Sequence, residues 1–177
     1  TYATSGNRIV LRFFAGWDFP AGILDDASFV DKAYENGVAM GGVLEAKSAH
    51  GAPEFLVMAH KDSMTANLQR VQMVKAWMED GKSREQVTDI ACSDGLVPDP
   101  KTGRCPDNGA SVDLKTCKPS VGQGDVTLAV PWRDPLLSLD HAVAYVIREL
   151  AYARFRSIES DSCWLRTYSP GGGHGVR

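Results

Sequence analysis

The chain has 177 residues, which is enough for one domain with a sizeable core and too short for two. Its net charge of −3 gives no basic surplus to neutralise a phosphate backbone, so nucleic acid is not an expected partner. No apolar run approaches the roughly 20 residues that cross a bilayer, so we expect no membrane span. The chain starts without Met and soon enters an apolar stretch, which indicates a piece of a larger protein.

The first third of the chain predicts three strands and a short helix. β-branched and aromatic residues at 8–14 predict the first strand. Apolar residues recur at helical spacing over 26–36, and Gly37 is placed to end that helix. The second strand is expected over 38–45, and the third over the compact apolar run 53–60.

A β-hairpin is expected over 69–92. The apolar residues of 68–78 fit a helix as well as a strand, but the Glu79-Asp80-Gly81-Lys82 sequence that follows is a strong hairpin signal. The residues after this turn are mostly of the β type. The turn therefore decides for two strands.

The second half of the chain is less regular. A loop rich in Asp, Pro and Gly precedes short strands expected over 110–117 and 125–132, and Pro131 marks the later strand as a sheet edge. Over 138–157 the spacing of Leu139, Val143, Val146 and Leu150 favours a helix.

These elements together predict a mostly β protein. We expect an antiparallel β-sandwich-like domain with one or two short helices over residues 1–157, as the C-terminal domain of a larger protein. The glycine-rich residues 158–177 are expected to be a poorly ordered tail.

Four cysteines are present: Cys92, Cys105, Cys117 and Cys163. Their spacing matches no zinc-binding motif. An even number of cysteines around an irregular loop favours disulfides, and hence a periplasmic or secreted protein. Three pairings of four cysteines are possible, and the sequence does not choose among them.

Two short peptides are the candidates for contact with another domain. Trp17 with Asp18, and Trp132 with Arg133 and Asp134, combine an aromatic ring with charged groups, which is common anchor chemistry at interfaces. The competing interpretation is that both tryptophans belong to the core, which is the commoner place for large aromatic side chains.

No catalytic residue, cofactor-binding residue or metal ligand is expected in the chain. The chain has four histidines: His50, His60, His141 and His174. No two of them have the spacing that places two metal ligands on one face of a helix or strand. Loop oxygens suit calcium but are more often simply solvated, and they belong to Asp94, Asp99, Asp107 and Asn108. No serine or cysteine has the surroundings of a nucleophile.

Several long peptides occur in a recognisable order. They include Arg12-Phe13-Phe14-Ala15-Gly16-Trp17-Asp18 and Trp132-Arg133-Asp134-Pro135, together with residues 2–9, 68–77 and 108–114. In this order they resemble the C-terminal part of a bacterial family known as domain of unknown function 3604. The resemblance spans nearly the whole chain.

The resemblance implies a larger parent protein. Members of that family begin with a barrel similar to the polymerase and histidinol phosphatase (PHP) superfamily, in which His and Asp residues hold divalent metals for hydrolysis. No metal ligand of that barrel has a counterpart here, so the metal is expected in an upstream barrel that is the partner of this chain. The family also implies a strand at 141–150, against the helical spacing, while Ala153 replaces a frequent family cysteine.

The expected function is therefore that of a non-catalytic C-terminal portion of a PHP-like phosphoesterase or other hydrolase of unknown substrate. The first alternative is a stand-alone ligand- or carbohydrate-binding module, in which Trp17, Trp77 and Trp132 line an exposed face. The second alternative is a truncated reading frame without a separate function.

Overall fold

The computed structural model describes residues 8–45, 51–113, 115–116, 118–137 and 142–151. In chain order its elements are β1 (Val10–Gly16), the 3-10 turn η1 (Ile23–Asp25), α1 (Phe29–Asn36), β2 (Gly37–Ala39), β3 (Glu54–His60), β4 (Leu68–Glu79), β5 (Lys82–Cys92), β6 (Val112–Asp113), β7 (Lys118–Pro119), β8 (Thr127–Arg133) and β9 (Val143–Ala151). The expected tail, 158–177, and the last residues of the expected domain, 152–157, lie outside the described residues.

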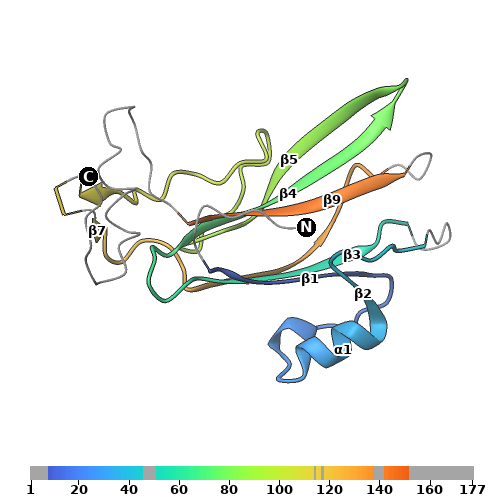
Figure 1. Cartoon of the computed structure of the whole chain (residues 1–177), viewed down its shortest axis with the longest axis horizontal. Helices are drawn as coiled ribbons and strands as arrows, with labels where there is room; N and C mark the ends of the chain where they lie inside the picture. Colours follow the sequence, from blue (N-terminus) through green and yellow to red (C-terminus); the bar gives the residue numbers. More distant parts are fainter. Residues whose placement is uncertain (1–7, 46–50, 114, 117, 138–141, 152–177) are drawn as a thin grey trace, which may run out of the picture.

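The described strands form two main antiparallel sheets that face each other. One sheet has the order β2-β1-β3-β8, and the other has the order β5-β4-β9. Figure 1 shows these sheets as two layers, with α1 covering the far side of the first sheet. The prediction of a mostly β, antiparallel, sandwich-like domain with one or two short helices is confirmed.

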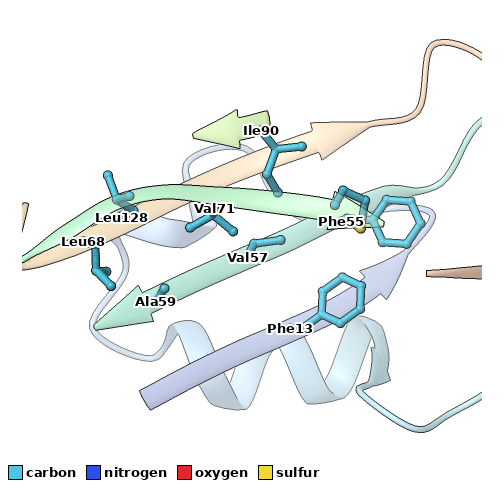
Figure 2. Close-up of a cluster of buried hydrophobic side chains, with 9 residues drawn as sticks. Phe13, Phe55, Val57, Ala59, Leu68, Val71, Ile90 and Leu128 are labelled. Carbon is cyan, nitrogen blue, oxygen red and sulfur yellow. The ribbon is translucent and has the colours of Figure 1, made fainter. Parts of the chain in front are cut away.

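The main core lies between the two sheets. Side chains alternate along a strand, so Phe13 points between the sheets while its neighbour Phe14 points to the helix side. Figure 2 shows the cluster between the sheets, where the rings of Phe13 and Phe55 stack at 5.8 Å. The cluster comprises Phe13, Phe55, Val57, Ala59, Leu68, Val71, Met73, Ile90 and Leu128.

A second, smaller core joins α1 to the outer face of the first sheet. Phe29 and Ala33 are the buried positions of α1, and they pack with Phe14, Ile23 and Leu56. The spacing of Phe29 and Ala33 is one helical turn, so both side chains lie on the same face. The helix prediction over 26–36 is confirmed for its C-terminal part, since α1 begins at Phe29.

The hairpin of β4 and β5 is confirmed. Glu79 pairs with Lys82, and the two residues between them, Asp80 and Gly81, have φ angles of 50° and 71°. Positive φ at both central residues is the requirement of the tight turn that matches strand twist, and Asp-Gly satisfies it at low cost. In Figure 1 the tip of this hairpin extends beyond the rest of the molecule.

The helix favoured over 138–157 by apolar spacing is wrong for the described part of that range. Val143–Ala151 form strand β9, which pairs with β4 from Leu68 to Trp77. The strand that the family resemblance implied is therefore correct. Pairing with β4 and the packing of Tyr145 and Ile147 on the core outweigh the helical spacing, which is a weak local preference.

Two expected strands are much shorter than predicted. The strand expected over 38–45 is only β2, because the chain turns at Gly41, where φ is 90°, and Gly42 donates a hydrogen bond back to Ala39. The strand expected over 110–117 is reduced to β6, which among the described strands pairs with β7 alone. The strand expected over 125–132 is β8, and among the described strands it lies at the edge of its sheet, as predicted.

Candidate functional site

The candidate contact residues gather at one end of the first sheet. β1 and β8 both run antiparallel to β3, so both end beside the first residue of β3, Glu54. Glu54 pairs with Gly16 on one side and with Arg133 on the other. The peptides that follow these strand ends carry Trp17, Asp18, Trp132, Arg133 and Asp134, which we call the strand-end site.

Trp17 and Asp18 differ in exposure although they are neighbours. Trp17 is only 8% exposed, and its indole Nε1 donates a hydrogen bond to the backbone carbonyl of Glu45 at 3.1 Å. Asp18 is exposed. The core interpretation therefore applies to the ring of Trp17, while Asp18 presents a carboxylate at the surface.

Trp132 and Arg133 point in opposite directions from the edge strand β8. Trp132 is half-buried, and its ring lies 5.7 Å from that of Phe55. Arg133 is exposed, donates to the carbonyl of Ala52 at 3.2 Å, and places Nε 3.4 Å from Glu54 Oε1. Like Asp18, Arg133 is thus a charged group at the surface of the strand-end site.

Asp134 is buried and joins the two sheets. Its Oδ2 lies 2.7 Å from Lys75 Nζ and accepts a hydrogen bond from the hydroxyl of Tyr145 at 2.8 Å. Lys75 also donates to the carbonyl of Leu136, and its ammonium lies 5.4 Å from the ring centroid of Trp77. Both charged groups of the pair are 4–7% exposed. They satisfy each other inside the protein, as buried charges require.

The phenol of Tyr145 is held in its neutral form. Burial, the hydrogen bond to Asp134 and the negative charge of that carboxylate all raise the pKa of Tyr145 above its usual range. Lys75 and Tyr145 were missed in the sequence. The only signal was that a lysine interrupts the apolar alternation of residues 71–77, which indicates a buried charge in need of a partner.

An open pocket of about 750 Å³ lies next to the strand-end site. One wall comes from β1 and the segment after it, the second from β2 and the turn after it, and the third from the start of β9. The side chains that line it are mostly apolar and include Phe13, Trp17, Val38, Met40, Phe55 and Tyr145. This size and composition are typical of sites that take up apolar groups.

The disulfide loop forms a second, separate polar cluster. Cys92 at the end of β5 is bonded to Cys105, with 5.6 Å between the Cα atoms. Beneath this loop the Asp89 carboxylate accepts hydrogen bonds from Cys105 N–H (2.7 Å), Gln72 Nε2 (2.5 Å) and Arg70 Nη1 (2.8 Å). Burial alone would raise the pKa of Asp89, but these donors outweigh it and lower the pKa.

The remaining cysteines, Cys117 and Cys163, lie outside the described residues. The disulfide between Cys92 and Cys105 is compatible with an oxidising compartment. No helix in the described ranges is long and apolar enough to cross a membrane.

The loop oxygens considered for calcium are engaged in hydrogen bonds within the protein. The Asp94 carboxylate accepts from Ser93 Oγ, Asn108 Nδ2 and the backbone N–H of Gly124. Asp99 and Asp107 each accept from backbone N–H groups in their own turns. Among the described residues, no three His, Cys, Asp or Glu side chains gather to hold a metal ion.

Of the four histidines, the described residues include His60, whose Nδ1 lies 2.7 Å from the Thr127 hydroxyl. His50, His141 and His174 lie outside the part of the chain that the structure describes.

The chain belongs to the family described as protein of unknown function DUF3604, whose model matches residues 1–168. No curated protein matches the chain, and no solved structure does. Membership of this family is shown over nearly the full length, which includes every described element.

Proposed function

We propose that this chain is the non-catalytic C-terminal part of a larger metal-dependent hydrolase of the PHP-like type, with an unknown substrate. In this proposal the chain contacts the rest of its parent protein through the strand-end site. One observation carries the contact: two peptides far apart in the sequence bring exposed Asp18 and exposed Arg133 to the same sheet end.

The chemistry of the site supports a binding role. Asp18 and Arg133 can form ion pairs at the surface, and Arg is favoured at interfaces because its planar guanidinium binds carboxylates with two hydrogen bonds. The buried cluster of Lys75, Asp134 and Tyr145 holds the segment after β8 in place from within. A rigid support of this kind lowers the entropic cost of forming a contact.

The catalytic metal belongs, in this proposal, to a barrel upstream of the chain, and the chain itself binds no cofactor. We further propose a periplasmic or secreted location, supported by the disulfide. Nucleic acid is not proposed as a partner, because the chain has a net charge of −3.

The test uses the full-length product of the native gene and the variant Arg133→Glu. The control is Lys101→Glu, which reverses an exposed charge in the disulfide loop. Mn²⁺-dependent hydrolysis of bis(p-nitrophenyl) phosphate and the melting temperature are measured. We expect Arg133→Glu to lower both in the full-length protein, with little effect on the melting of the 177-residue chain, since an exposed ion pair contributes about 0–1 kcal/mol.

Two results would count against this function. A full-length protein without metal-dependent hydrolysis would remove the hydrolase assignment. If Arg133→Glu and Lys101→Glu had equal effects on hydrolysis and on the melting temperature of the full-length protein, the strand-end site would not be the contact.

The stand-alone ligand-binding module remains a second candidate, because the apolar pocket has the volume of a small-molecule site. The form of this idea that depends on exposed tryptophans has less support, since Trp17 is buried and Trp132 lies against the core. The ligand-binding module predicts that the intact chain binds an apolar dye in the pocket. The truncated reading frame predicts that the source cells contain no native product longer than this chain.

A further inference from the structure

The two sheets of the sandwich are unequal in the part of the chain that the structure describes. The β2-β1-β3-β8 sheet has four strands, and the β5-β4-β9 sheet has three. β9 lies at an edge of its sheet among the described strands, and the ring centroid of its Tyr145 is 4.5 Å from that of Phe55 in β3. Among the described strands, none pairs with the other side of β9.

The apolar pocket lies at this edge. Its walls include Phe13 and Ala15 of β1, Val38 of β2, and Val143 and Tyr145 of β9. Met40 and Val43, beside β2, are 56% and 78% exposed. An apolar surface next to an open strand edge is the arrangement that a further strand would cover, because the edge supplies backbone hydrogen bonds and the pocket accepts alternate side chains.

The length of the chain after β9 allows it to supply that strand. Residues 152–177 follow β9 directly, and the family model continues through the first 17 of them, to Tyr168. This part is therefore shared by the family, whereas the glycine-rich end beyond it is not matched. Running back along the nine residues of β9 requires about 30 Å, or roughly nine residues in an extended conformation, which leaves enough chain for a turn.

The sequence before Tyr168 has the pattern of an edge strand. In an extended strand, alternate side chains would fall into two sets on opposite faces. The uncharged set comprises Cys163, Leu165 and Thr167, and the other set, which contains the charged Arg166, comprises Trp164, Arg166 and Tyr168. The uncharged set fits an apolar pocket, and Arg166 would then lie on the opposite, solvent side. This choice of face follows from the cost of burying an unpaired charge.

We propose that residues 163–168 bind along the open edge of β9 as a fourth strand of its sheet, with Leu165 in the apolar pocket. This proposal does not depend on the hydrolase assignment, because the occupant is part of the same chain. It also accounts for the exposed apolar side chains around β2, which the added strand would cover.

The test compares two charge substitutions at neighbouring positions of the 177-residue chain, Leu165→Asp and the matched control Arg166→Asp. Melting temperature and the fluorescence of the apolar dye anilinonaphthalene sulfonate (ANS) are measured. We expect Leu165→Asp to lower the melting temperature by about 4 °C or more and to raise dye fluorescence several-fold. Arg166→Asp is expected to change the melting temperature by roughly 1 °C or less.

Two truncations keep the test decisive if Leu165→Asp fails to fold. Deletion of 159–177 is expected to raise dye binding, whereas deletion of 169–177 is expected to leave it unchanged. Cys163→Ser controls for the cysteine that the longer deletion removes.

Four outcomes would overturn the proposal. Leu165→Asp and Arg166→Asp could have equal effects, or deletion of 159–177 could leave dye binding unchanged. The unmodified chain could bind the dye with one-to-one stoichiometry, which would mean an open ligand pocket. It could also dimerise, with the dimer lost in Val146→Arg, which would mean that a second copy covers β9.

Discussion

At the scale of single residues, one buried ion pair crosses between the two sheets. Asp134 after β8 is bound by Lys75 of β4 and Tyr145 of β9, so one carboxylate joins three strands from both sheets. Removal of one partner leaves a buried charge less well solvated, and that loss is usually larger than the net contribution of the intact pair.

The hydroxyl of Tyr145 should contribute measurably to stability. We expect Tyr145→Phe to lower the free energy of unfolding by about 1.5–3 kcal/mol, because it removes a hydrogen bond to a buried carboxylate. Tyr34→Phe is the control, since that tyrosine is 61% exposed. Urea unfolding measures both variants, and equal stabilities would show that the bond to Asp134 has no energetic role.

Substitution of Asp89 should lower the stability more than Tyr145→Phe does. Asp89→Asn removes a charge that accepts from Arg70, Gln72 and the Cys105 N–H, and we expect a loss of about 3–5 kcal/mol. Asp107→Asn, in an exposed turn, is the control and should be nearly neutral. Urea unfolding at pH 7 measures both variants.

The same carboxylate predicts a pH dependence. The pKa of Asp89 is lowered on folding, so its stabilisation is fully present above the unfolded pKa of about 4 and is lost as pH falls through the folded value. Asp89→Asn should therefore flatten the acid side of the stability profile. A variant profile parallel to that of the unmodified chain would contradict this assignment.

At the scale of elements, β9 is where local and long-range preferences conflict. In a strand, Val146 and Ile147 point to opposite faces, and Val146 is 57% exposed whereas Ile147 packs against the core. We expect Ile147→Ala to lower the free energy of unfolding by about 1–3 kcal/mol and Val146→Ala by roughly 0.5 kcal/mol or less. Chemical denaturation of the two variants measures this difference, and equal losses would contradict the strand.

Sequence reasoning succeeded where the determining interactions are local. The Asp80-Gly81 turn, the compact run of β3 and the spacing of Phe29 and Ala33 each contain their own signal, and all three elements are found. β9 failed because its partner β4 is distant in the sequence, and pairing decided its conformation. The length of β2 was overestimated because the turn at Gly41 was not recognised.

The candidate site was predictable only in part. The two peptides of the strand-end site were identified from their composition, but their proximity depends on the register of β1 and β8 on β3. The buried pair of Lys75 and Asp134 required the packing of one sheet on the other. The pairing of Cys92 with Cys105 likewise depends on the return of the loop to Asp89.

At the scale of the whole molecule, the disulfide constrains the longest irregular connection among the described residues. Cys92 and Cys105 are 13 residues apart, and a loop of this length gives an expected stabilisation of about 3 kcal/mol. Cys92→Ser with Cys105→Ser should lower the free energy of unfolding by that amount. Dithiothreitol should destabilise the unmodified chain similarly but leave the double variant unchanged, and an equal effect on both would assign the loss elsewhere.

The same scale contains the central claim, that this β-sandwich is the non-catalytic part of a larger hydrolase. Its polar clusters are internal: the groups around Asp89 and Asp134 bind one another across the core and the disulfide loop. What the described surface offers is an apolar pocket and two charged strand ends. In the function proposed above, the charged strand ends contact the rest of the parent protein.

The most direct measurement is the mass of the native product in its source cells, by immunoblot with an antibody raised against this chain. We predict a band well above the 19.2 kDa of the chain, because the upstream barrel would be part of the same polypeptide. A single band at about 19 kDa would contradict the account and would make a free-standing binding module the leading function.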